Sequence, residues 1–126
     1  MSERRDERVG VVLPRRLGGL VAVLLAAGLG LPQAARATDD AKQLADGKAL
    51  FAGSAVPPCG LCHTLKDAGT SGAIGPVLDE LQPDAARVAT ALRNGIGAMP
   101  SYKATLKEEQ IQALARYVAK ATGGAR

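Results

Sequence analysis

The chain has 126 residues, which is enough for one small domain and too few for two of ordinary size. Its 16 Lys and Arg exceed its 12 Asp and Glu, for a formal net charge of +4, and its aromatic residues are one Phe and two Tyr. Two cysteines cannot build a disulfide-rich scaffold, and a hydrophobic content of 47% argues against intrinsic disorder. So few rings leave a thin conventional core, which favours a bound group inside the fold.

Residues 1–37 have the pattern of a secretory signal peptide. Positions 1–16 hold more Arg than acidic residues, positions 17–31 are apolar and uncharged, and the small-x-small triplet Ala35-Arg36-Ala37 follows. Together these features predict export through the Sec route and cleavage after Ala37. An uncleaved anchor is the alternative, but the apolar run of 15 residues is shorter than the ~20 that span a bilayer.

Cleavage would leave a domain of residues 38–126 without a membrane span. Its ten basic and nine acidic side chains give a net charge of +1, so most of the positive excess belongs to the leader. The domain has no basic run and almost no aromatic surface on which bases could stack. This composition excludes a nucleic-acid-binding protein.

The first helix of this domain is predicted over residues 39–52. Asp39 or Asp40 can cap its N-terminus, apolar positions recur at helical spacing, and Gly53 marks its end. The following segment, 54–82, is too rich in Pro and Gly to be regular throughout. A connection of this length is unusual in so small a domain, so we expect it to wrap around a cofactor.

Two further helices are predicted. One begins after Pro83-Asp84 and ends at Asn94-Gly95. The other begins at the capping box Thr105-Leu106-Lys107-Glu108 and keeps its apolar period as far as Gly123-Gly124. No segment alternates as a strand does, so the predicted fold class is all-α.

Segment 54–82 contains Cys59-Gly60-Leu61-Cys62-His63, which is the C-x-x-C-H attachment pattern of c-type haem. Two thiols three positions apart can add to the two vinyl groups of one haem and form thioethers. The imidazole of the next residue can then bind the iron, and His63 is the only histidine of the chain. We therefore predict one covalently attached haem c, held by Cys59, Cys62 and His63.

Three alternative roles for the two cysteines fit the sequence less well. A zinc site needs a third and a fourth Cys or His at suitable spacing, and the chain has none. A thioredoxin-like redox pair would follow a strand in a βαβ context, whereas Pro57-Pro58 precedes this motif. A structural disulfide between Cys59 and Cys62 would close a small, strained ring.

The sixth iron ligand is predicted to be Met99. Apart from Met1 it is the only methionine, and it stands in Gly95-Ile96-Gly97-Ala98-Met99-Pro100, after the helix that ends at residue 94. The glycines allow close approach to a flat ligand, and a thioether ligand raises the potential of a haem. The alternative is a methionine that fills a gap in the core, and the nearby Tyr102 is interpreted as packing.

These motifs, with Gly75-Pro76 and the run from 94 to 121, resemble the small single-haem cytochromes c of the bacterial periplasm. The same run is similar to the soluble photosynthetic cytochromes of algae and cyanobacteria. The chain is also similar to the cytochromes that serve periplasmic sulfite-oxidising dehydrogenases.

The resemblance implies a cytochrome c fold, with three or more helices around one haem. It implies that Gly47 and Phe51 of the first helix contact Tyr117 of the last. It also implies that the carbonyl of Pro76 accepts a hydrogen bond from His63 and fixes the ring. In this family the haem is attached outside the cytoplasm to a chain that is exported unfolded.

The predicted function is one-electron transfer by a periplasmic carrier with His/Met axial ligation. Its partners would be a redox donor and acceptor, such as a periplasmic dehydrogenase and a terminal oxidase or another cytochrome. With both axial positions filled no substrate can bind the iron, so the protein is not expected to be an enzyme by itself. One alternative is a tightly bound haem subunit of an oxidoreductase such as a sulfite dehydrogenase, in place of a monomer. Another is a haem-based sensor, which would need a displaceable Met99.

Overall fold

The computed structural model describes residues 31–125, nearly all of which belong to the unit Pro32–Arg126. Of the predicted signal peptide, 1–37, only residues 31–37 are therefore described. The described chain is mostly helical, which confirms the predicted all-α class.

The first helix, α1 (Leu31–Ala49), already includes the described residues before Asp39 and continues into a π-helical turn, η1 (Leu50–Ser54). The residues before Asp39 are rich in alanine, the strongest helix former. Asp39 and Asp40 consequently lie inside the helix, so the prediction that one of them is the N-cap is wrong. The predicted end of the helix near Gly53 agrees with the end of η1.

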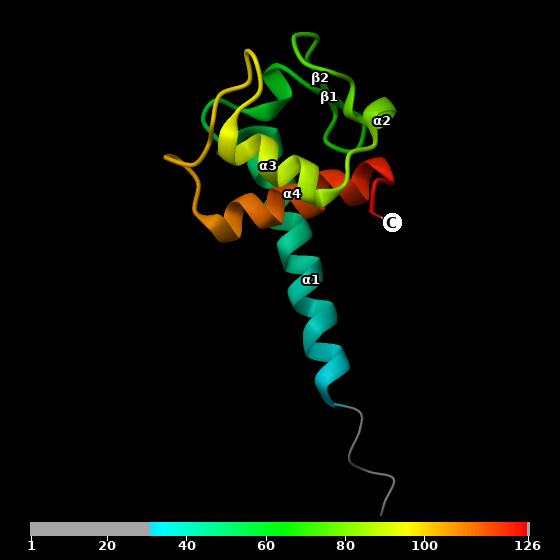
Figure 1. The fold of residues 1–126 in the computed structure, drawn as a ribbon. Coiled ribbons are helices and arrows are strands. Elements are labelled where there is room, and N and C mark those ends of the chain that lie inside the picture. Colours follow the sequence, from blue (N-terminus) through cyan, green and yellow to red (C-terminus); the bar gives the residue numbers. More distant parts are fainter. Residues whose placement is uncertain (1–30, 126) are drawn as a thin grey trace, which may run out of the picture. The chain divides into compact units, whose positions relative to one another are not determined.

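Helix α1 crosses α4 (Glu108–Thr122) at the contact that the family resemblance implies (Figure 1). A Cβ atom on Gly47 would lie 2.3 Å from the carbonyl oxygen of Ala113 and 2.6 Å from Cβ of Tyr117, so only glycine fits at the crossing. The ring of Phe51 then packs edge-on against that of Tyr117, with ring centroids 6.2 Å apart. The only Phe of the chain thus joins the two helices.

Helix α3 (Ala85–Asn94) packs against α4. It begins after Pro83-Asp84, as predicted, and its N-cap is Asp84, whose Oδ1 accepts a hydrogen bond from the backbone N–H of Arg87 at 2.8 Å. The helix ends at Gly95, whose φ of 71° suits glycine.

The N-terminus of α4 differs from the prediction. Its N-cap is Lys107, whose backbone N–H donates to Oε1 of Gln110 at 2.9 Å. The hydroxyl of Thr105 instead donates to the carbonyl of Tyr102 at 3.4 Å, so Thr105–Glu108 is not the capping box. Gln110 provides an acceptor at the N3 position, and this moves the start of the helix to Glu108.

Four short elements occupy the predicted irregular segment 54–82. They are η2 (Cys59–Leu61, a 3₁₀ turn), β1 (Thr64–Leu65), β2 (Thr70–Ser71) and α2 (Leu78–Leu81). The strands β1 and β2 pair antiparallel, with Thr64 opposite Ser71, and Gly69 turns the chain between them at a φ of 66°. This pair was not predicted, because two residues are too few to show an alternating pattern.

The core lies where α3 and α4 meet η1 and the segment that follows it. Its largest fully buried side chains are Phe51, Leu65, Leu92, Ile111 and Leu114. Of the helices formed by residues 31–125, none has both the length and the apolar character needed to cross a membrane.

Candidate functional site

A cavity of about 370 Å³ lies beside the core, and all five predicted site residues line it: Cys59, Cys62, His63, Pro76 and Met99. Most of the other lining side chains are apolar, among them Phe51, Leu78, Val88, Leu92, Leu114 and Val118. Its size lies within the ~300–1,000 Å³ that is usual for cofactor and ligand pockets.

The 3₁₀ turn η2 presents the two cysteines to the cavity. The backbone N–H groups of Cys62 and His63 both donate to the carbonyl of Cys59, at 3.1 and 2.9 Å, which keeps the motif tightly folded. Both cysteines are free thiols, and Cys59 is buried. Burial raises the pKa of the Cys59 thiol to about 11, against smaller lowering effects of its own backbone and of the Tyr102 hydroxyl.

The imidazole of His63 is held between Pro76 and Gly75. Its Nδ1 lies 3.0 Å from the carbonyl oxygen of Pro76, and because a carbonyl can only accept, Nδ1 carries the proton. A Cβ atom on Gly75 would lie 2.4 Å from Cε1 of the ring, so the backbone there packs directly on the imidazole. This arrangement leaves Nε2 as the ring nitrogen for a metal.

Met99 closes a tight turn after α3. The backbone groups of Ile96 and Met99 exchange two hydrogen bonds, of 3.1 and 2.9 Å, across Gly97 and Ala98. Gly97 has a φ of 57°, which an ordinary side chain rarely adopts. The turn therefore depends on its glycine, and it fixes the backbone from which the Met99 thioether extends.

This set of groups fits a covalently attached haem. It combines two thiols, one oriented imidazole, one thioether and apolar walls around a single cavity. Within residues 31–125, His, Cys, Asp and Glu side chains form no group of three or more that could hold a metal ion. A structural zinc site would need four such ligands.

Two features of the cavity were not anticipated from the sequence. The hydroxyl of Tyr102 donates to the carbonyl of Pro57 at 2.8 Å, so Tyr102 does more than fill space. Ile74, Leu81 and Ile96 line the cavity and are also exposed, at 75%, 39% and 65%. We call these three side chains the apolar rim; nothing in the sequence motif signals it, because they stand far apart along the chain.

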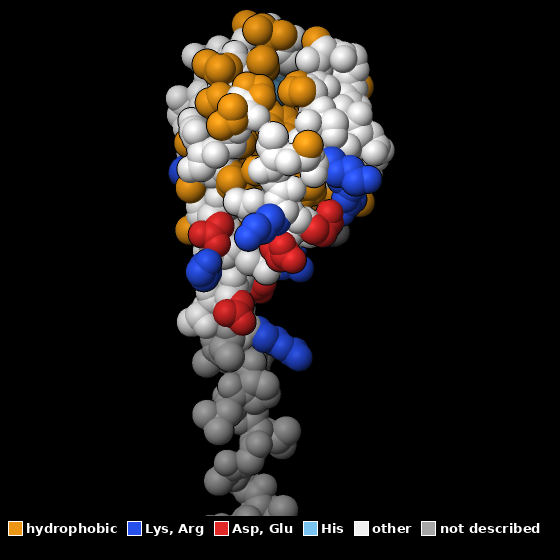
Figure 2. Space-filling model, turned by 90° about the vertical axis from the view of Figure 1, so that its left-hand side faces the viewer, with side chains coloured by type: hydrophobic (Ala, Val, Ile, Leu, Met, Phe, Trp, Pro, Cys, Tyr) orange, Lys and Arg blue, Asp and Glu red, His pale blue; other side chains and the backbone are white. Residues whose placement is uncertain are grey.

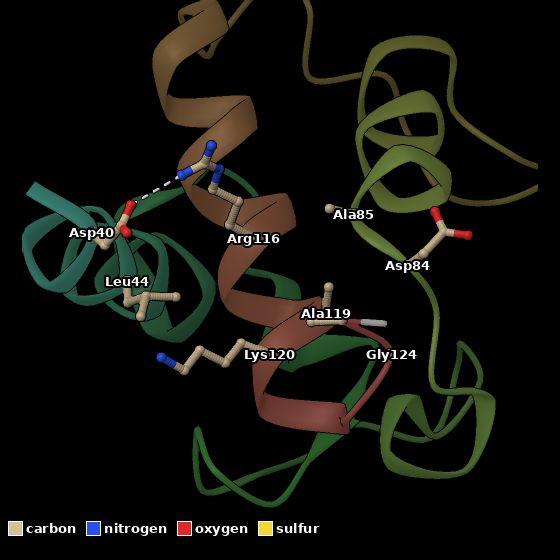
Figure 3. A pocket seen from close by; sticks show the side chains of 9 residues that line it. Asp40, Leu44, Asp84, Ala85, Arg116, Ala119, Lys120 and Gly124 are labelled. Carbon is tan, nitrogen blue, oxygen red and sulfur yellow. Dashed lines mark hydrogen bonds and ion pairs between the residues drawn. The ribbon is translucent and has the colours of Figure 1, made fainter. Parts of the chain in front are cut away.

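A second cavity, of about 390 Å³, lies between α1, the start of α3 and the end of α4 (Figure 3). Arg116 points across it toward Asp40, with Nη1 and Oδ1 3.3 Å apart, and both side chains are largely exposed. The lining residues, which include Asp84 and Lys120, offer no thiol, imidazole or thioether. The predicted haem chemistry therefore belongs to the first cavity alone.

Comparison with known proteins identifies c-type cytochromes as the proteins that this chain is similar to. The family model described as cytochrome c oxidase, cbb3-type, subunit III, matches residues 42–118, a segment that holds all five predicted site residues. Among solved structures, the c-type cytochrome SorU from Sinorhizobium meliloti is 49% identical, and the match covers 68% of this chain and 98% of that one with a TM-score of 0.64. No curated protein sequence matches the chain.

Proposed function

The chain belongs to the c-type cytochromes, in the family described as cytochrome c oxidase, cbb3-type, subunit III, and it carries covalently bound haem c; from this we propose that it transfers single electrons in the periplasm with His63 and Met99 as axial ligands. Its family makes it an electron carrier rather than an enzyme. The observation that carries the proposal is the meeting of one oriented imidazole and one thioether in a single apolar cavity.

Bound in this cavity, the haem supplies a one-electron couple at its iron. Cys59 and Cys62 are the proposed attachment points, supported by their free thiols and their place in the cavity wall. His63 is the proposed proximal ligand, supported by the Pro76 hydrogen bond that leaves Nε2 for the metal.

The proposed ligands are held in place by contacts of the polypeptide itself. His63 rests on Gly75 and Pro76, and Met99 extends from a turn that its own backbone closes with Ile96. Side chains fixed in this way need to move little when an electron arrives or leaves. A rigid site of this kind suits a carrier, which has to exchange electrons in both directions.

We propose that the redox partner approaches at the apolar rim formed by Ile74, Leu81 and Ile96. On the face drawn in Figure 2, hydrophobic side chains gather over the upper part and charged side chains lie below them. Exposed apolar side chains around a cavity are typical of a contact surface. A carrier that releases its partner quickly would bury less than ~1,200 Å² in such a contact.

Export and cleavage after Ala37 complete the proposal. They are supported by the charge and hydropathy pattern of residues 1–37 and by the resemblance to periplasmic cytochromes c, which implies haem attachment outside the cytoplasm. The described part of the predicted leader, 31–37, forms only the first turns of α1. From residue 36 to 46 no side chain of α1 is buried. Of the residues that cleavage after Ala37 would remove, Arg36 and Ala37 are therefore not buried.

The apolar rim also suits a second function, that of a haem subunit bound permanently to an oxidoreductase such as a sulfite dehydrogenase. A permanent subunit would bury a larger and more apolar interface than a carrier does. Gel filtration of the native protein at high salt separates the two, because only the permanent complex would stay intact.

The proposal is tested on Met99 with two variants of the haem-loaded protein. Met99→Ala and Met99→Leu both remove the sulfur, but leucine keeps almost the volume of the side chain. If Met99 is a ligand, both variants should lose the weak red absorption band of methionine-bound ferric iron, lower the potential and admit carbon monoxide. A methionine that only packs would let Met99→Leu behave as the unmodified protein does, and that result would contradict the assignment.

A further inference from the structure

Tyr102 joins two segments that lie 45 residues apart in the sequence. Its side chain is only 4% exposed, and its hydroxyl donates to the carbonyl oxygen of Pro57 at 2.8 Å. Both residues line the haem cavity. A buried tyrosine hydroxyl with one good acceptor is a fixed contact, because breaking it leaves the buried hydroxyl without that acceptor.

The backbone of Tyr102 is anchored on the other side. Its N–H donates to the carbonyl of Leu92 in α3 at 2.7 Å, and its carbonyl accepts from the N–H of Leu106 at 2.9 Å. Ser101 adds a hydrogen bond from its hydroxyl to the carbonyl of Arg93. Tyr102 therefore links α3 to the segment that begins at Pro57.

The two ends of this hydrogen bond stand next to the residues that hold the haem. Pro57 is two residues before Cys59, and Tyr102 is three residues after Met99. We propose that Tyr102 is a positioning residue: its hydrogen bond to Pro57 ties the Met99 turn to the cysteine segment and keeps the thioether within reach of the iron. The inference rests on the proposed His/Met ligation.

The chain supplies a matched control in its other tyrosine. Tyr117 is also 4% exposed, and within the described residues its hydroxyl makes no hydrogen bond, although the Asp67 carboxylate lies near enough to raise its pKa further than burial does alone. Tyr102→Phe and Tyr117→Phe therefore remove the same atom from equally buried sites. Only the first removes a hydrogen bond next to Met99.

The experiment measures imidazole affinity of the ferric, haem-loaded protein. Imidazole can bind only when the sixth ligand has left the iron, so its apparent affinity reports the fraction of molecules in which Met99 is detached. Tyr102→Phe should strengthen imidazole binding about fivefold, which corresponds to about 1 kcal/mol for one hydrogen bond. Tyr117→Phe should leave it unchanged, and hydrogen exchange of the amides at 96–101 should rise only in the first variant.

The same substitution in the Met99→Leu variant shows whether Tyr102 acts through Met99. In Met99→Leu the sulfur is already absent, so adding Tyr102→Phe should not change imidazole affinity further. An equal effect in both backgrounds would overturn the positioning role, because the tyrosine would then act on the cavity directly. No effect of Tyr102→Phe on an unmodified protein that shows the red methionine band would overturn this inference alone. Absence of that band from the unmodified protein would overturn the proposed ligation, and the inference with it.

Discussion

The imidazole of His63 packs directly against the backbone of Gly75, where there is no room for a larger residue. A Cβ atom on Gly75 would lie 2.4 Å from Cε1 and 2.7 Å from Nδ1 of the ring, far inside contact distance. The ring cannot yield easily, because its Nδ1 is held 3.0 Å from the carbonyl of Pro76. Gly75→Ala should therefore destabilise the haem-loaded protein by about 1–3 kcal/mol, the usual effect of overpacking, and perturb the haem spectrum.

Gly53 provides the control for this change. It lies in η1, and an added Cβ would meet nothing within 4 Å. Gly53→Ala should leave both the thermal midpoint and the spectrum near those of the unmodified protein. If Gly75→Ala unfolded at the same temperature as Gly53→Ala, the imidazole would not be as tightly held as the structure indicates.

The candidate haem residues and one of their supports, the Pro76 carbonyl beside His63, could be predicted from the sequence, whereas the other supports could not. Cys59, Cys62 and His63 could be proposed because one haem and its vinyl groups fix the spacing of such residues along the chain. Met99 could be proposed as the sixth ligand because the chain has no other methionine outside the predicted leader, and this role stays a prediction. The hydrogen bond from Tyr102 to Pro57 joins residues 45 positions apart, and no local pattern reports such a contact.

Among the elements, α3 and α4 are joined at one end by a charged pair. Arg93 near the end of α3 donates through Nε to Glu108 at 3.2 Å and makes a second bond through Nη2, while Gln112 donates to the same carboxylate at 2.8 Å. The hydrogen bond from Arg93, with smaller help from Gln112, lowers the pKa of Glu108 to about 2.

This pair predicts a defined loss of stability in acid. A carboxyl whose pKa is lower in the folded than in the unfolded chain stabilises the fold above its unfolded value of 4.5, and this contribution disappears as the pH falls toward 2. Glu108→Gln should therefore lower the melting temperature at pH 7 by no more than a few degrees, since the pair is exposed. The difference from the unmodified protein should shrink below pH 4.5 and vanish near pH 2.

Glu109→Gln is the control, because Glu109 shares the first turn of α4 and thus the same helix dipole. Melting curves of both variants across this pH range separate the ion pair from the dipole. Equal shifts in the two variants would mean that the Arg93 pair adds nothing.

The helix boundaries show where local sequence patterns were not enough to predict the structure. The start of α3 was predictable because Asp84 caps it through a contact three residues along the chain. The start of α4 was misplaced because two polar residues compete for the role: Thr105 turns to the Tyr102 carbonyl, and Gln110 receives the Lys107 N–H. The start of α1 depends on which residues precede Asp39, and the prediction assumed that they had been removed.

At the scale of the whole molecule, the described residues of α1 differ in whether they are buried in the fold. Gly47 is buried at the crossing with α4, but from residue 36 to 46 no side chain is buried. A chain that begins at Thr38 would keep the crossing and would place Asp39 and Asp40 in the first turn of the helix, where acidic side chains favour the dipole. The fold of the haem domain is thus consistent with removal of the leader after Ala37.

Protein purified from the periplasm of its native host should accordingly have the mass of residues 38–126 plus one haem. The haem should remain attached through acid-acetone extraction and denaturing electrophoresis, because thioethers to Cys59 and Cys62 are covalent.

On gel filtration at high salt a carrier should elute alone, since a small, transient interface does not survive dilution. A mass that includes residues 1–37 would contradict cleavage, and extractable haem would contradict attachment through both thiols. Co-elution with an oxidoreductase in fixed proportion would instead establish the permanent subunit, with the apolar rim of Ile74, Leu81 and Ile96 as the surface to test for the contact.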